Sequence, residues 1–142
     1  KTVFPPIQNM TQRAGLKLGY DILLGTGWYL DERFPEAAEQ LRSAWESNFR
    51  DPRVDGMYAS ALTLAGMPDV GDAVFTEAAR WHSRSPRFLL AYATTQIQLQ
   101  RNAGEAKSAL LSALDGNTHQ PTIDELNSLL ALLGDVPPAP LP

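Results

Sequence analysis

The sequence of 142 residues contains no cysteine and only two histidines. Disulfides and thiolate-bound metals are therefore excluded, and the histidines lack the spacing of a zinc site. The lack of cysteine is compatible with the cytoplasm and with the periplasm and does not decide between them. No apolar run approaches the roughly 18–20 residues of a membrane-spanning helix. No signal peptide is visible, but the chain starts at Lys1 rather than at methionine, so we expect a processed form or a domain of a longer protein.

Basic residues are few as well. Twelve Lys and Arg stand against 16 Asp and Glu, which gives a net charge of −4, and the basic residues are scattered along the chain. Nucleic acids and anionic membranes require a concentrated basic surface, so the sequence argues against both as partners. The hydrophobic fraction of 44% and the charged fraction of 20% are ordinary for one globular domain with a sizeable core.

The residues that carry chemistry do not converge on a catalytic site. His82 is expected near a helix end and His119 in a turn, where both have structural or solvated roles. The sequence Gly25-Thr26-Gly27 lacks the Lys and Ser or Thr that follow in a phosphate-binding loop, so tight helix packing explains it better. Paired carboxylates fall in the first turns of expected helices, where they complement the helix dipole. We therefore predict no enzymatic activity, no cofactor and no metal.

Three prolines divide the chain at regular intervals. Pro52, Pro86 and Pro121 are 34 and 35 residues apart, and each precedes a run of helical periodicity. Asp51 and Ser85 stand directly before the first two prolines, as expected for a helix cap followed by proline at the first helical position. This spacing indicates an internal repeat of helical hairpins.

The apolar periodicity predicts an all-α fold of seven helices and no strands. Capping boxes at Asn102–Glu105 and Thr122–Glu125 indicate the starts of the last two helices. The expected helices cover residues 8–30, 35–48, 53–65, 70–83, 87–100, 104–114 and 122–133. Short turns between them favour antiparallel helical hairpins, and a generic helical bundle is the alternative.

The placement of small and large apolar residues resembles the tetratricopeptide repeat. That family packs helices closely through small residues at fixed positions, the eighth position of the first helix among them. Gly25 and Thr94 fall at this position in two copies. The middle copy takes Ala61 there and then needs a one-residue insertion between Gly66 and Gly71. The second-helix core positions become Ala37, Leu41 and Ala44, then Val74, Ala78 and Trp81, then Ala106, Leu110 and Ala113.

The resemblance implies a short right-handed solenoid with three divergent repeats. These cover about residues 18–51, 52–85 and 86–120, and a leucine-rich helix at 121–134 caps them. The first helix is longer than a standard repeat allows. Residues 135–142 are too rich in proline for a helix and are expected to form an extended tail or linker. We expect Trp28 and Trp81 to be buried and make no prediction for Trp45.

In the resembling family, the first helices of the repeats line a concave groove that binds a partner. Its positions in this chain are Ile22, Thr26, Tyr29, Asp55, Tyr58, Leu62, Phe88, Thr95 and Gln98. This face is apolar and aromatic and lacks the basic clamp with which some family members bind the acidic C-termini of heat-shock chaperones. An extended apolar peptide or an amphipathic helix fits it better. The alternative is internal filling by the N-terminal segment around Val3, Phe4 and Ile7.

These features together predict a non-catalytic protein–protein interaction module. We expect a scaffold or adaptor of a bacterial assembly, secretion or envelope system, with another protein or a peptide as partner. The alternative is a structural spacer or dimerisation unit of a larger repeat protein, which the leucines of the last helix and the proline-rich tail favour.

Overall fold

The computed structural model describes residues 6–141, with side chains from residue 13 onward, as a stack of helices without strands. The described helices are α1 (Pro6–Leu30), α2 (Phe34–Glu46), α3 (Pro52–Leu64), α4 (Pro68–His82), α5 (Pro86–Gln98), α6 (Ala103–Leu114) and α7 (Gln120–Leu133). All seven predicted helices are confirmed, and each bound lies within two residues of its expected place. The all-α prediction is therefore correct.

The prolines begin helices as expected, but the capping side chains behave less uniformly. Pro52 and Pro86 are the first residues of α3 and α5. Asp51 accepts hydrogen bonds from two first-turn amides, as an N-cap does. The side chains of Ser85 and Asn102 make no such bond. Thr122 lies inside the first turn of α7 rather than at its cap. Ser85 and Asn102 therefore occupy the predicted N-cap positions without the predicted side-chain bond, whereas the predicted capping box at Thr122 is wrong.

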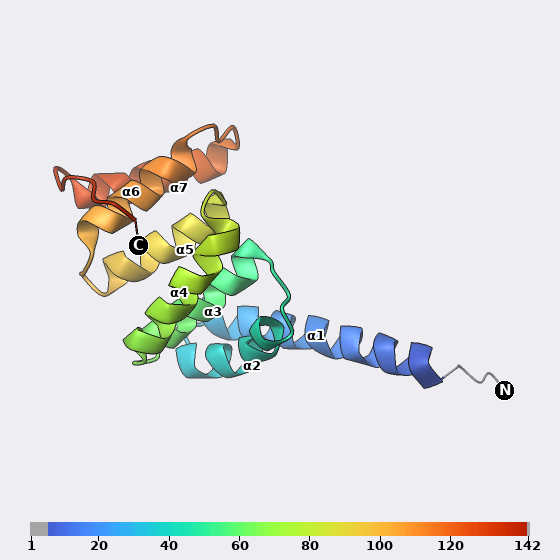
Figure 1. The fold of residues 1–142 in the computed structure, drawn as a ribbon. Coiled ribbons are helices and arrows are strands. Elements are labelled where there is room, and N and C mark those ends of the chain that lie inside the picture. Colours follow the sequence, from blue (N-terminus) through green and yellow to red (C-terminus); the bar gives the residue numbers. More distant parts are fainter. Residues whose placement is uncertain (1–5, 142) are drawn as a thin grey trace.

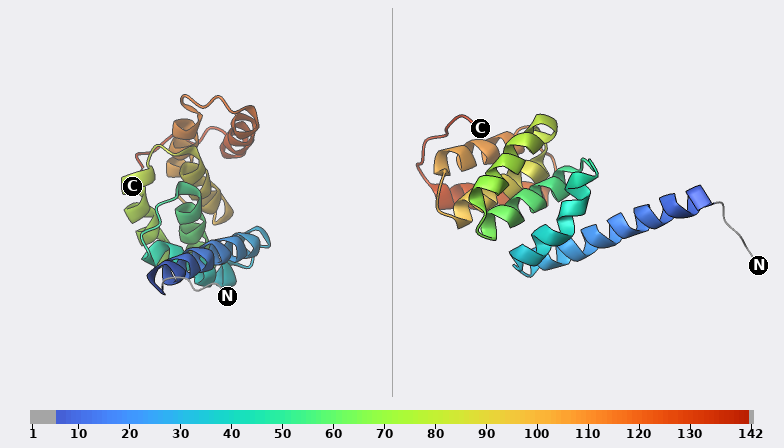
Figure 2. Two further views of the ribbon diagram at one scale, coloured as in Figure 1. Left: turned by 90° about the vertical axis from the view of Figure 1, so that its right-hand side faces the viewer. Right: turned by 60° about the horizontal axis from the view of Figure 1, so that its bottom comes forward.

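Adjacent helices form three hairpins, α1 with α2, α3 with α4 and α5 with α6, and the hairpins stack side by side. Helix α7 packs against α6 at one end of the stack, and α1 extends beyond α2 at the other end (Figures 1 and 2). Helix α3 contacts α1, α2, α4 and α5. Every residue from 54 to 63 is consequently buried, so α3 has no polar face and forms the centre of the core.

The buried residues follow one register in all three hairpins. In each second helix a small residue is followed by a large apolar residue four positions later and by alanine after three more. These buried triplets are Ala37–Leu41–Ala44, Gly71–Phe75–Ala78 and Ala106–Leu110–Ala113. Their first members are 34 and 35 residues apart. The insertion predicted in the middle repeat is therefore wrong, and Ala59 rather than Ala61 corresponds to Gly25 and Thr94.

The exposure of Trp81 is a further sign of this shift in register. Trp81, predicted to be buried, is 50% exposed, and the next residue, His82, is buried instead. The guanidinium of Arg50 lies 4.3 Å from the Trp45 ring centroid and 4.7 Å from that of Trp81. These aromatic side chains therefore make cation–π contacts on the surface that join α2 to α4. Trp28 is half-buried against the core.

Glycines set the closest approaches between helices. A Cβ atom at Gly25 would lie 2.5 Å from the Leu41 side chain, and one at Gly71 would lie 2.7 Å from the Thr63 backbone nitrogen. These distances are too short for real contacts, so α2 and α4 reach their partner helices only because these positions are glycine. Gly27 has nothing within 4 Å of such an atom. Tight packing therefore explains Gly25 but not Gly27.

The two ends of the chain differ from a simple repeat array. The predicted filling of the groove by Val3, Phe4 and Ile7 concerns side chains that lie outside the described ones. Residues 135–141 are non-helical, as expected, but they fold back onto α6 (Figure 1). They do not extend away from the domain as a linker would.

Alanine at Gly71 and alanine at Gly27 are expected to have opposite effects on stability. Alanine is the better helix former, so Gly27→Ala should raise the free energy of unfolding by about 0.5–1 kcal/mol. Gly71→Ala should lower it by about 1–3 kcal/mol, because the added methyl meets the backbone of α3. Urea denaturation of the two variants and the wild type measures both changes. Stabilisation by Gly71→Ala would show that α3 and α4 are not closely packed.

Candidate partner-binding groove

An open groove runs along one side of the stack over the first helices of the hairpins, with Glu125 of α7 at its edge. It encloses about 340 Å³. The residues that line it are Thr26, Tyr29 and Leu30 from α1, Arg53 and Met57 from α3, Arg87, Leu90, Ala91 and Thr94 from α5, and Glu125 from α7. Its volume is in the range of sites that bind small ligands or short peptide segments.

The floor of the groove is mostly apolar and its rim is charged. Met57 and Leu90 are largely buried, whereas Arg53, Arg87 and Glu125 are exposed. Arg53 and Arg87 lie in the first turns of α3 and α5, where a positive side chain opposes the helix dipole. Helix stability therefore does not explain these arginines. In the part of the chain that the structure describes, neither forms a salt bridge.

A chain of three hydroxyl groups joins α1, α3 and α5 beside the groove. The Tyr29 hydroxyl lies 2.9 Å from Ser60 Oγ, and Ser60 Oγ lies 2.6 Å from Thr95 Oγ1. Thr95 Oγ1 is also 2.7 Å from the Ala91 carbonyl. One assignment satisfies all three groups: Tyr29 donates to Ser60, Ser60 to Thr95, and Thr95 to the carbonyl. Burial raises the pKa of the Tyr29 phenol, so it remains protonated and able to donate.

The structure brings only part of the predicted groove together. Thr26 and Tyr29 line the groove. Ile22 is half-buried against the core, and Gln98 is exposed near the end of α5. The other five predicted residues are buried between helices and do not line it: Asp55, Tyr58, Leu62, Phe88 and Thr95. For Asp55, Tyr58 and Leu62 the cause is the misplaced register of α3, which rotates these positions away from the groove.

Tyr58 and Phe88 illustrate the burial of the remaining positions. The Tyr58 ring centroid is 6.1 Å from that of Trp45, and the Phe88 centroid is 5.9 Å from that of Phe75. Both rings therefore pack between helices as core residues. A charge at either position would damage the fold, so these residues cannot report on partner binding.

Asp55 forms a buried pair with His82 that sequence reasoning missed. Asp55 Oδ2 lies 2.8 Å from His82 Nε2, and both residues are buried between α3 and α4. Asp55 Oδ1 has no hydrogen-bond partner among the described residues. Burial raises the pKa of the Asp55 carboxyl, and the hydrogen bond from His82 lowers it in part. This pair lies inside the core, away from the groove, and connects the two helices of one hairpin.

Sequence reasoning also missed the charged rim of the groove. Arg53 and Arg87 are each the residue after a helix-starting proline, and a signal was available there. Two arginines at equivalent first-turn positions, 34 residues apart, are unfavourable for helices and therefore indicate another role.

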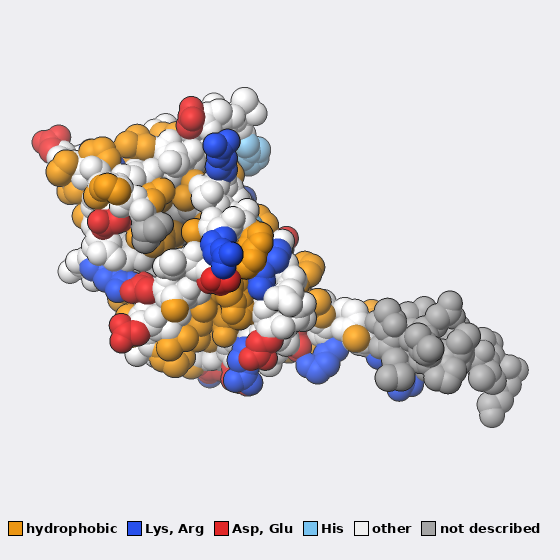
Figure 3. All heavy atoms as spheres, viewed as in Figure 1, with side chains coloured by type: hydrophobic (Ala, Val, Ile, Leu, Met, Phe, Trp, Pro, Cys, Tyr) orange, Lys and Arg blue, Asp and Glu red, His pale blue; other side chains and the backbone are white. Residues whose placement is uncertain are grey.

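The described residues show no arrangement for metal chemistry or membrane insertion. None of their histidine, aspartate and glutamate side chains gather in a group of three that could hold a metal ion. No described helix has the length and apolar character needed to cross a membrane. On the face shown in Figure 3, Lys and Arg side chains are interspersed with Asp and Glu rather than gathered in one basic patch.

Comparison with known proteins relates the fold to one solved structure. No family model matches the sequence, and no curated protein does. The type III secretion chaperone SycD of Yersinia enterocolitica, solved in complex with a peptide of the translocator YopD, has a similar fold with a TM-score of 0.63. The similarity covers 82% of this chain and 91% of that chain at 18% sequence identity. At this identity it shows a shared helical-repeat fold.

Burial of the charged Asp55 carboxylate destabilises the fold, and this destabilisation grows as the pH rises. Asp55→Asn is expected to remove it. The raised pKa means that the folded protein binds this proton more tightly than the unfolded chain, whose ordinary value is 3.8. Stability is therefore lost as the pH rises from that value through the folded-state pKa.

Urea denaturation of wild type and Asp55→Asn between about pH 3.5 and 7 measures this linkage. The free energy of unfolding of the variant minus that of the wild type should increase with pH. Asp69→Asn, at an exposed first-turn carboxylate, is the control. A difference that stays constant or shrinks with rising pH would contradict a raised pKa for Asp55.

Proposed function

We propose that this protein is a non-catalytic adaptor that binds an extended segment of a partner protein in the groove between α1, α3, α5 and α7. The observation that carries the proposal is an apolar floor bordered by two arginines that have no role in helix stability. Buried hydroxyls hold the three first helices together beside it, so the groove exists before a partner arrives.

The repeat architecture supports this proposal. The chain is a divergent member of the tetratricopeptide repeat family, with repeats at about residues 18–51, 52–85 and 86–120 and a cap at 121–134. The equal spacing of the buried triplets in the three hairpins supports this assignment. The similar fold of a secretion chaperone bound to a translocator peptide supports a place in a bacterial secretion or assembly system.

The groove also defines the chemistry of its partner. Apolar side chains would fit over Met57, Leu90 and Ala91, which form the floor. A carboxylate on the partner would pair with Arg53 or Arg87 at the rim, and this charge-assisted hydrogen bond would fix the orientation of the bound segment. The partner segment is therefore apolar with at least one acidic group, rather than purely apolar as the sequence alone predicts.

Reversal of charge at Arg87 tests this proposal. Random peptides displayed on phage are first selected on the wild-type protein, and their affinities are then measured by fluorescence anisotropy. Arg87→Glu should weaken the selected peptides roughly tenfold or more, since a hydrogen bond to a charged group contributes about 1.5–3 kcal/mol.

Arg84→Glu is the matched control. Arg84 is also exposed and lies three residues away, but it does not line the groove. It should change the affinities less than about twofold, because solvent and salt weaken an exposed charge that does not contact the peptide. If no peptide is selected on the wild type, or if both variants lose affinity equally, binding in this groove is refuted.

A second function, self-association, is favoured by an exposed stripe on α1. Leu16, Tyr20, Leu23 and Leu30 are between 61% and 76% exposed. Together with Gly27 they follow alternating intervals of four and three residues. This is the spacing of a coiled-coil seam, so the stripe fits the same helix of a second copy.

Sedimentation over a range of protein concentrations tests self-association. If the stripe joins two copies, the wild type should sediment as a dimer at high concentration, and Leu16→Lys combined with Leu23→Lys should sediment as a monomer. Val70→Lys, a change at an exposed apolar residue on α4, should leave the dimer intact. A wild type that stays monomeric at every concentration would rule this function out.

A further inference from the structure

The segment that follows α7 binds along α6. Gly134, with φ of 58°, ends α7, and its carbonyl accepts a hydrogen bond from Lys107 Nζ at 2.9 Å. Further on, the Ala139 amide donates to the Gly104 carbonyl at 3.0 Å, and Ser108 Oγ donates to the Ala139 carbonyl. Both backbone groups of Ala139 are therefore bonded to one helix.

Helix α6 is shaped for this contact. A Cβ atom at Gly104 would lie 2.9 Å from the Ala139 Cβ and 3.0 Å from the Pro137 carbonyl oxygen. Glycine is a poor helix former, so its place in the first turn of α6 has no explanation in helix stability. The close passage of residues 137–139 does explain it.

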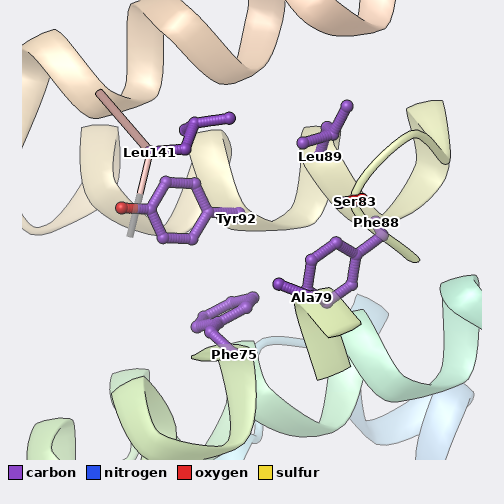
Figure 4. Close-up of a pocket in the computed structure, with 7 residues that line it drawn as sticks. All are labelled: Phe75, Ala79, Ser83, Phe88, Leu89, Tyr92 and Leu141. Atoms are coloured by element: carbon purple, nitrogen blue, oxygen red, sulfur yellow. The ribbon is translucent and has the colours of Figure 1, made fainter. Parts of the chain in front are cut away.

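Leu141 anchors the end of the segment in an apolar pocket (Figure 4). The pocket is formed by Phe75 and Ala79 from α4 and by Phe88, Leu89 and Tyr92 from α5. Leu141 remains 37% exposed, and about 60 Å³ of the pocket stays open. A neighbouring hollow of about 320 Å³, which Pro140 lines, shares Phe75 and Tyr92 with it. The segment therefore occupies this site without filling it.

We propose that the face formed by α4, α5 and α6 is a second peptide-docking site, specific for extended segments of the type Pro-x-Pro-Leu. The chain's own residues 137–141 occupy it in cis. Three separate features recognise the segment. Backbone hydrogen bonds hold it to α6, glycine admits its close approach, and the pocket takes its leucine. Prolines keep the segment extended before it binds, which reduces the entropy lost on docking.

This site is independent of the groove proposed above. Leu89 and Tyr92 face the second site, whereas Leu90, Ala91 and Thr94 face the groove on another side of α5. A partner with the same motif has to displace the chain's own segment, which is present at high effective concentration. The apparent affinity for such a partner is therefore lowered by the fraction of sites that are already occupied.

A peptide with the sequence of residues 136–142, Val-Pro-Pro-Ala-Pro-Leu-Pro, is the probe for this site. Its binding to the intact 142-residue chain is followed by the amide NMR shifts of α4, α5 and α6, which remain measurable for millimolar affinities. Leu141→Asp releases the internal anchor, because the pocket that holds it is apolar. This variant should bind the peptide about tenfold more tightly than the wild type, since the peptide no longer competes with the tail.

Control variants and a control peptide decide where and how the peptide binds. Gly104→Val in the Leu141→Asp background should abolish binding, because the added side chain occupies the path of the peptide. Circular dichroism checks that this variant keeps its helices, and Gly104→Ala should give a smaller loss. A peptide with aspartate in place of its leucine should not bind. Arg87→Glu should leave this binding unchanged, which separates the second site from the groove.

Three results would overturn the proposal. One is equal affinity of the wild type and Leu141→Asp for the peptide, and another is absence of amide shifts at millimolar peptide. The third is concentration-dependent association of the wild type that Leu141→Asp abolishes. That outcome would place the segment on a second copy of the chain rather than in cis.

Discussion

The close approach of α3 to its neighbouring helices is the constraint on which the rest of the structure depends. Four helices contact α3, and two of them, α4 and α5, approach it through glycine and alanine. At Gly56 a Cβ atom would lie only 2.9 Å from the Ala91 side chain of α5, and at Gly71 it would meet the α3 backbone. Because large side chains are absent at these crossings, dispersion contacts extend along the whole length of α3. Its polar groups, such as Asp55 and Ser60, must therefore find partners inside the protein.

The same burial decides where partners can bind. Since α3 is covered on all sides, only its first turns reach the groove, where Arg53 and Met57 border it. Most of the groove surface comes instead from α1 and α5, with Glu125 of α7 at the rim.

Helix α5, unlike α3, contributes to both proposed sites. One of its sides lines the groove and another lines the pocket of Leu141, so a single helix lies between both proposed sites.

The helices, their order and most of their bounds were predictable from the sequence, because periodicity and helix-starting prolines are local signals.

The register of the middle repeat was not predictable from the sequence. Asp55, Ser60 and Thr63 are buried with polar partners, so α3 has no polar side that would mark its orientation. The middle triplet begins with Gly71 instead of an alanine, so its equivalence to the triplet that begins with Ala37 is not visible in the sequence. The predicted groove residues of α3 were therefore wrong as well. Arg53 and Arg87 were missed although their first-turn positions are unfavourable for helices. The return of residues 135–141 to α6 depends on contacts across 31 and more positions, such as Ser108 with Ala139, which local patterns do not encode.

The hydroxyl chain from Tyr29 through Ser60 to Thr95 has a consequence for the shape of the molecule. Close packing already resists changes in the distance between helices, and hydrogen bonds, which are directional, hold their relative rotation as well. Three helices from three successive hairpins share this one chain. It therefore fixes the spacing and the relative rotation of α1, α3 and α5 beside the groove. A partner would meet a rigid template and lose less entropy than on a surface that has to be ordered first.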